Sequence, residues 1–247
     1  MSPTTIPGKM TLAQEFTWNE SVWNPSMLST ALWLDAADAS TITKDGSDLV
    51  SQWNDKSGNG RNATASSTAR PTYSATSFNG KPGLVFDGNS DDMSFTRVTN
   101  IRSFIGLLFW TDTTGDYRSI LGDSNFYDFH GATAASGKLF SATDANPAVR
   151  NGDKWVNGTA QAAADLLARY TSPTIHIIQT TGNVQANQFQ DRNASRFFYG
   201  TYAELVLVTR VLTTLERQKI EGYLAHKWGL TANLPAGHPY KLVGPTP

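Results

Sequence analysis

Short apolar runs recur along the chain, and turns rich in Gly, Asn and Asp separate them. Runs of this kind between such turns are typical of β-strands. Residues 104–110 form the most apolar run and predict a central strand buried on both faces. The other predicted strands are 31–35, 49–53, 83–86, 93–95, 119–121, 126–129, 138–140, 154–156, 174–178 and 202–208. The pattern therefore predicts an all-β fold, a two-sheet antiparallel β-sandwich.

A helical period appears near the end of the chain. Apolar residues recur at every fourth position there and predict one C-terminal α-helix over about 213–228. The stripe consists of Ile220, Leu224 and Trp228. Thr213 or Thr214 can cap its first turn, and Gly229 suits its C-terminal end. A second, shorter helix is predicted over the Ala- and Leu-rich stretch 161–169.

The first residues, 1–28, predict an N-terminal arm ahead of a single domain over 29–247. The arm contains Pro3, Pro7 and Pro25 and has no sustained period. It also contains large apolar side chains, which disordered tails seldom have. These are Phe16, Trp18, Trp23 and Met27. The arm therefore either packs on its own domain or docks onto a neighbouring subunit.

Composition and charge exclude several classes of protein. Charged residues make up 17% of the 247 residues and the net charge is -1, with no cluster of Lys and Arg, so no nucleic-acid partner is expected. The chain contains no Cys, which excludes disulfides and thiolate metal sites. No apolar run approaches the ~20 residues that span a membrane. The N-terminus lacks an apolar signal core, so if the protein acts outside a cell we expect it to leave by another route, of which release by lysis as part of a virus particle is one.

Three blocks of the sequence together carry a resemblance to a known family. They are residues 33–38 (WLDAAD), 53–88 (WNDKSGNGRNA to NGKPGLVFDG) and 210–241, which includes KWGL and LPAGHPY. The chain resembles concanavalin A-like, or laminin G-like, jelly-roll domains, in particular a bacterial and phage subgroup with that ending. The resemblance covers about residues 30–241, and the stretch 112–195 matches little.

The resemblance implies a non-catalytic module that binds glycans or proteins. We expect a non-enzymatic structural component of a phage particle, such as a decoration, fibre or tail-associated protein. Its expected partners are other virion proteins or its own copies, contacted through the arm, and a host-surface glycan or receptor. The alternative is a bacterial carbohydrate-binding module or lectin, located outside the cell or on its surface.

The resemblance also implies a calcium site near the Phe-Asp-Gly turn. Asp87, Asp91 and Asp92 could supply carboxylate oxygens, the ligands that calcium prefers. Many relatives carry an Asp where this chain has Ala203, which favours the alternative that these acids only form the turn.

Exposed aromatic side chains could form a sugar-binding platform, because sugars present apolar C–H faces. The candidates near turns are Trp155, Tyr117, Tyr127 and Tyr170. The alternative is that these rings fill the core, as most Trp and Tyr residues do. Four other tryptophans are predicted for the core: Trp33, Trp53, Trp110 and Trp228.

No arrangement typical of an enzyme is evident in the sequence. Retaining glycosidases place two carboxylates close together on a strand, whereas Glu204 stands alone on its predicted strand. Glu204 is expected to make a structural hydrogen bond or to contact Arg210. The four histidines lack zinc-binding spacing, and His176 is predicted to be a hydrogen-bonded residue of the core or a sheet face.

Overall fold

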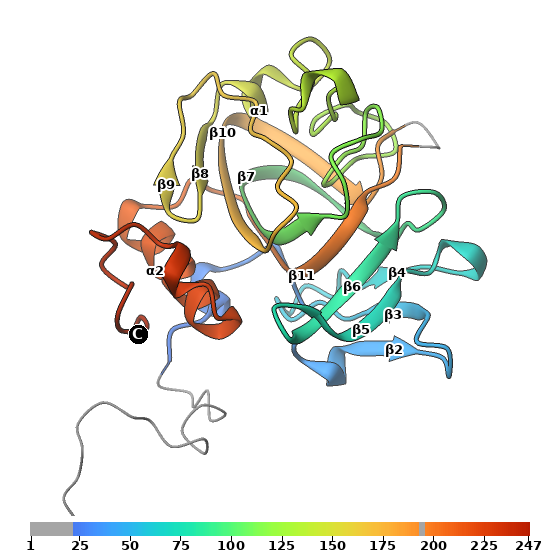
Figure 1. The fold of residues 1–247 in the computed structure, drawn as a ribbon, viewed down its shortest axis with the longest axis horizontal. Coiled ribbons are helices and arrows are strands. Elements are labelled where there is room, and N and C mark those ends of the chain that lie inside the picture. Colours follow the sequence, from blue (N-terminus) through green and yellow to red (C-terminus); the bar gives the residue numbers. More distant parts are fainter. Residues whose placement is uncertain (1–21, 193–195) are drawn as a thin grey trace, which may run out of the picture.

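The computed structural model describes residues 22–192 and 196–247 (Figure 1). Within these ranges, eleven strands form a curled antiparallel sheet. The strands are β1 (Leu32–Asp35), β2 (Ile42–Lys44), β3 (Val50–Trp53), β4 (Ala63–Thr64), β5 (Thr72–Phe78), β6 (Lys81–Asp87), β7 (Ser94–Trp110), β8 (Asp153–Val156), β9 (Thr159–Ala160), β10 (Thr174–Gln188) and β11 (Tyr199–Val208). The predicted all-β sandwich with one C-terminal helix is confirmed.

Helices contribute little to the fold. The α-helices described are α1 (Pro147–Arg150) and α2 (Thr214–Trp228). Five 3-10 turns accompany them in the described ranges: η1 (Pro25–Leu28), η2 (Ala39–Thr41), η3 (Ser67–Ala69), η4 (Ala134–Ser136) and η5 (Thr231–Asn233). In the described part of the chain, no helix has the length and apolar character to cross a membrane.

The long strand β7 occupies the centre of the sheet. It pairs with β10 on one side and with β11 on the other. From β10 the sheet continues to β8 and β9, and from β11 it continues to β1 and β6. Residues 104–108 of β7 are all buried, so the predicted central strand is confirmed. The four tryptophans predicted for the core are also buried.

The helix α2 begins and ends where local sequence signals predict. Thr213 and Glu216 form a reciprocal capping box at its start. Gly229 follows its last residue with φ 72°, a left-handed conformation that glycine adopts without strain. The apolar stripe of Ile220, Leu224 and Trp228 is buried. Figure 1 shows α2 beside β8 and β9, and the Arg217 guanidinium of α2 lies 4.5 Å from the centre of the Trp155 ring of β8.

Replacing Thr213 by alanine is expected to lower the free energy of unfolding by about 1 kcal/mol. The substitution removes the Oγ1 atom that accepts the Glu216 N–H at 3.3 Å. Urea denaturation measures the change, with Thr214→Ala as the control. Thr214 is exposed and is the first helical residue, so its loss should change stability by less than about 0.5 kcal/mol. Equal effects of the two substitutions would contradict the capping role.

The second helix predicted over 161–169 is wrong, because tertiary hydrogen bonds hold this stretch in an irregular conformation. The Ala163 carbonyl accepts the Lys154 Nζ group at 2.8 Å. The Leu167 carbonyl accepts the Leu139 N–H at 2.8 Å, and Leu167 itself has φ 55°. Three predicted strands, 119–121, 126–129 and 138–140, are also absent as named strands. These segments lie in the loops between β7 and β8, and 138–140 takes part in two isolated bridges, Gly131 with Phe140 and Lys138 with Ala168.

Part of the predicted arm lies outside the described residues, including Phe16 and Trp18. In the described part, Trp23 is buried and its ring packs edge-on against Tyr223 at 6.2 Å. The Trp23 N–H also donates to the Pro245 carbonyl at 3.3 Å. Leu28 is buried as well, whereas Met27 is exposed. The residues directly before β1 therefore pack on the domain to which they belong.

Candidate functional site

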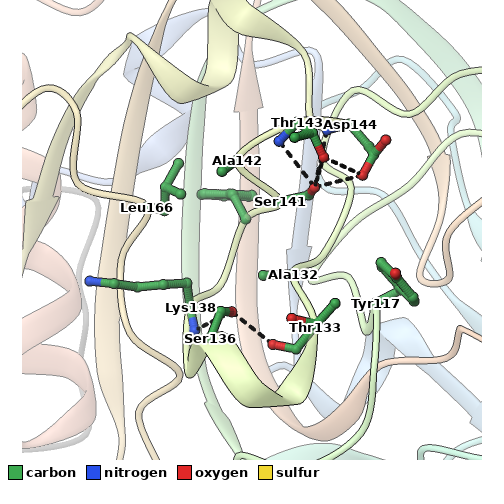
Figure 2. A pocket seen from close by; sticks show the side chains of 11 residues that line it. Tyr117, Ala132, Thr133, Ser136, Lys138, Ser141, Ala142, Thr143, Asp144 and Leu166 are labelled. Carbon is green, nitrogen blue, oxygen red and sulfur yellow. Dashed lines mark hydrogen bonds between the residues drawn. The ribbon is translucent and has the colours of Figure 1, made fainter.

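A pocket of about 220 Å³ lies among the loops between β7 and β10 (Figure 2). Its lining combines four Ser and Thr side chains, two aromatic residues, three aliphatic residues and two charged residues. These are Thr133, Ser136, Ser141 and Thr143; Tyr117 and Phe140; Ala132, Ala142 and Leu166; and Lys138 and Asp144. Figure 2 shows Tyr117 and Asp144 on one side, opposite Leu166 and Lys138.

Tyr117 is held in a backbone conformation that bulky residues rarely adopt. Its φ is 57°, in the left-handed region. The Tyr117 N–H donates to the Ala132 carbonyl at 2.8 Å, and this carbonyl also accepts Arg169 Nη2 at 2.8 Å. Arg169 Nη1 donates to the Gly115 carbonyl at 2.7 Å, so one buried guanidinium ties together both loops that carry the pocket. Such over-determined strain occurs preferentially at binding sites.

One face of the Tyr117 ring is covered by a cation and an imidazole. The Arg196 guanidinium lies 4.4 Å from the ring centre, and the His130 ring stacks on it at 5.3 Å. If these two groups lay on opposite faces of the Tyr117 ring, their separation would be close to the sum of these two distances. Arg196 Nη1 instead approaches His130 Nε2 to 3.4 Å. Both groups therefore support the same face of the ring, and Tyr117 lines the pocket.

Asp191 anchors this supporting pair. It is buried, and its Oδ2 atom accepts the Ser119 hydroxyl at 3.2 Å and pairs with His130 Nδ1. The same oxygen lies 3.9 Å from Arg196 Nη1. In a catalytic triad the imidazole stands between the serine and the acid, whereas here the carboxylate stands between the serine and the imidazole. The cluster is thus built to position Tyr117 rather than to activate Ser119.

The predicted aromatic residues fall in different places. Tyr117 lines the pocket, and the Tyr127 ring packs edge-on against His130 at 4.7 Å, just outside the lining. Tyr170 packs on His176 of β10 at 5.6 Å. Trp155 is half-buried beneath Arg217 and pairs with Ile177, so it faces the opposite side of the sheet from His176. Trp155 and Tyr170 therefore share no surface with the pocket.

The three predicted calcium ligands form hydrogen bonds within the protein. Asp87 Oδ1 accepts the N–H groups of Asn89, Ser90 and Asp91 at 2.8 to 2.9 Å. Asp91 Oδ2 accepts the Asp87 N–H at 2.8 Å, and Asp92 accepts the Phe189 N–H at 3.0 Å. These contacts are those of a turn and its link to β10.

The electrostatics of the three acids also differ from one another. Burial raises the pKa of Asp91 to about 7 and that of Asp92 to about 6. Although burial opposes it, backbone hydrogen bonds lower the pKa of Asp87. In the ranges 22–192 and 196–247, no group of three or more His, Cys, Asp or Glu residues could hold a metal ion. A calcium site here stays a prediction from the resemblance.

Glu204 on β11 is the centre of a buried network that the sequence only partly predicts. Its Oε1 atom accepts Trp33 Nε1 at 2.7 Å and the Tyr223 hydroxyl at 3.1 Å. Its Oε2 atom accepts Trp228 Nε1 and Lys227 Nζ, both at 2.8 Å. The expected structural hydrogen bond is therefore confirmed.

The expected contact of Glu204 with Arg210 is wrong. Arg210 forms a bidentate pair with Glu216 at the start of α2, with distances of 2.9 and 2.6 Å. A guanidinium next to an exposed capping carboxylate gains two charge-assisted bonds without being buried.

The network extends to Asp35 of β1. Lys227 Nζ lies 2.7 Å from Asp35 Oδ1, and Lys56 Nζ lies 2.9 Å from Asp35 Oδ2. Despite burial, the two ammonium groups lower the pKa of Asp35, whereas burial raises that of Glu204. Residues from all three sequence blocks of the resemblance meet in this network. Because it is buried and fully paired, its role is to join β1, β11 and α2.

Comparisons with family models, with curated proteins and with solved structures give no match for this chain.

Proposed function

We propose that this chain is a non-catalytic β-sandwich recognition module that binds a glycan in the pocket beside Tyr117. The observation that carries the proposal is the ring of Tyr117, which is supported on one face and borders a pocket lined by hydroxyl groups. An aromatic face packs against the C–H groups of a sugar. Hydroxyl and carboxylate oxygens beside it can bind the sugar hydroxyls and fix the orientation of the ligand.

Replacing Tyr117 by asparagine is expected to weaken glycan binding about tenfold or more, because the stacking surface is lost. Asparagine tolerates a left-handed backbone, so the substitution keeps the loop conformation at φ 57°. A glycan array followed by titration of the best ligand measures the effect. Tyr117→Phe keeps the ring and should bind within about threefold of the wild type.

Tyr73→Ala is the matched control. Tyr73 is a half-buried tyrosine of β5 outside the pocket, with Lys44 Nζ 5.3 Å from its ring centre. This variant should bind like the wild type. A wild-type protein that binds no glycan on the array would contradict the proposal, as would unchanged binding by Tyr117→Asn.

The resemblance supports the further proposal that the module belongs to a phage particle as a decoration, fibre or tail-associated protein. Two apolar residues of the predicted arm, Trp23 and Leu28, are buried within the chain itself and are not available to another subunit. Immunogold labelling with an antibody against this chain tests the location. Label on particles supports this proposal, and label only on bacterial cells supports the alternative of a bacterial lectin or carbohydrate-binding module.

A further inference from the structure

Of the two charged residues that line the pocket, Asp144 contributes a negative charge and Lys138 turns its positive charge away. Among the lining residues, only Lys138 and Asp144 are charged. Lys138 Nζ donates to Asp165 Oδ1 at 3.1 Å, and Figure 2 shows its side chain extending away from Tyr117 and Asp144. The pocket is therefore lined by the methylene stem of Lys138 rather than by its ammonium group.

Asp144 is fixed in place by the hydroxyl groups next to it. Its Oδ2 atom accepts Ser141 Oγ and Thr143 Oγ1, both at 2.8 Å, and its own N–H donates to Ser141 Oγ at 3.0 Å. These hydrogen bonds lower the pKa of Asp144 and keep it ionised, and the bond from Thr143 has a larger effect than the bond from Ser141. Its Oδ1 atom accepts no hydrogen bond from the described residues, so it is open to a ligand.

We infer that the pocket binds neutral sugars and excludes acidic ones, and that Asp144 sets this specificity; the inference rests on the proposed glycan binding. A fixed carboxylate with an open oxygen accepts the hydroxyl groups of a neutral sugar. A second carboxylate, on a uronic acid, would be placed near Asp144, where the cationic lining residue, Lys138, is already paired with Asp165. The Arg196 guanidinium lies against Tyr117, and its Nη1 atom lies 3.9 Å from Asp191 Oδ2.

The test uses pairs of sugars that differ only at the sixth carbon. Methyl glycosides of glucose and galactose are compared with those of glucuronic and galacturonic acid in calorimetric titrations of the full chain. The wild type is expected to bind each neutral sugar about tenfold or more tightly than its acid, because like charges at close range repel. The difference in affinity between each neutral sugar and its acid should become smaller at high salt, because salt screens exposed charges.

Asp144→Asn is expected to reduce this preference to about threefold or less, since it removes the charge and keeps a carbonyl acceptor. Asp153→Asn, at an exposed aspartate on β8, is the control and should keep the wild-type preference. Equal binding of neutral and acidic sugars by the wild type would overturn the inferred selection against acidic sugars, but the proposed glycan binding would stand. A preference that survives Asp144→Asn would overturn the role of Asp144. If neither sugar of any pair binds, the proposed function fails together with this inference.

Discussion

Replacing Lys227 by methionine is expected to lower the free energy of unfolding by about 3–5 kcal/mol, the usual cost of removing one partner from a buried ion pair. Lys227 Nζ lies 2.7 Å from Asp35 and 2.8 Å from Glu204, and Glu204 is only 1% exposed. Methionine fills a similar volume but leaves two carboxylates without the cation between them. Chemical denaturation at neutral pH measures the loss.

Two further variants make this prediction specific to the buried charge. Lys219→Met alters an exposed contact of the same helix, with the Thr246 carbonyl, and should cost less than about 1 kcal/mol. Adding Glu204→Gln to Lys227→Met should recover part of the loss, because it removes the carboxylate that Lys227→Met leaves without a cation, whereas Asp35 keeps Lys56. A loss as small as that of Lys219→Met would show that the network contributes little to stability.

Between pH 6.5 and pH 4, the wild type is expected to lose about 3 kcal/mol of stability relative to a His176→Leu variant. Burial lowers the pKa of His176 from 6.5 to about 4, and neither ring nitrogen has a hydrogen-bond partner within the described residues. Between these pH values the His176 imidazole binds a proton in the unfolded chain but stays largely neutral in the folded chain. The free energy of unfolding therefore falls as the pH falls. Above about pH 7.5 the imidazole is almost entirely neutral in both states and the difference is constant.

Urea denaturation of both proteins across this pH range measures the effect. Asp91 and Asp92, whose pKa values burial raises, act in the opposite direction by stabilising the fold as the pH falls. They are present in both proteins, so the difference between the two curves isolates His176. Parallel curves would mean that the folded protein accommodates the charged imidazole.

Sequence signals predicted the elements whose determinants are local. The helix α2 has its capping box, its stripe and its terminal glycine within one continuous segment. Residues 161–169 have a helical composition but no such caps, and their carbonyl groups bind Lys154 and Leu139 instead. Likewise, His176 is buried as expected but lacks the expected partners, because its environment depends on Tyr170 and on neighbouring strands.

The candidate site was predictable only as far as a loop tyrosine. Tyr117 could be named as an aromatic residue near a turn, and the run Ser141 to Asp144 reads as a hydroxyl-rich turn. Support for the ring comes from His130 and Arg196, which belong to other loops, so no spacing in the sequence reveals it. Trp155 had the same sequence features as Tyr117, but its strand places it beside Arg217 instead.

The Glu204 network has a consequence for the order of events during protein synthesis. Glu204 leaves the ribosome before Tyr223, Lys227 and Trp228, which supply three of its four hydrogen-bond donors. Until these residues emerge, burial of β11 would leave the Glu204 carboxylate with a single hydrogen-bond donor, Trp33. The nascent sheet therefore cannot close stably around β11 before the last turn of α2 has been translated. Vectorial synthesis thus delays completion of this domain until its final helix arrives.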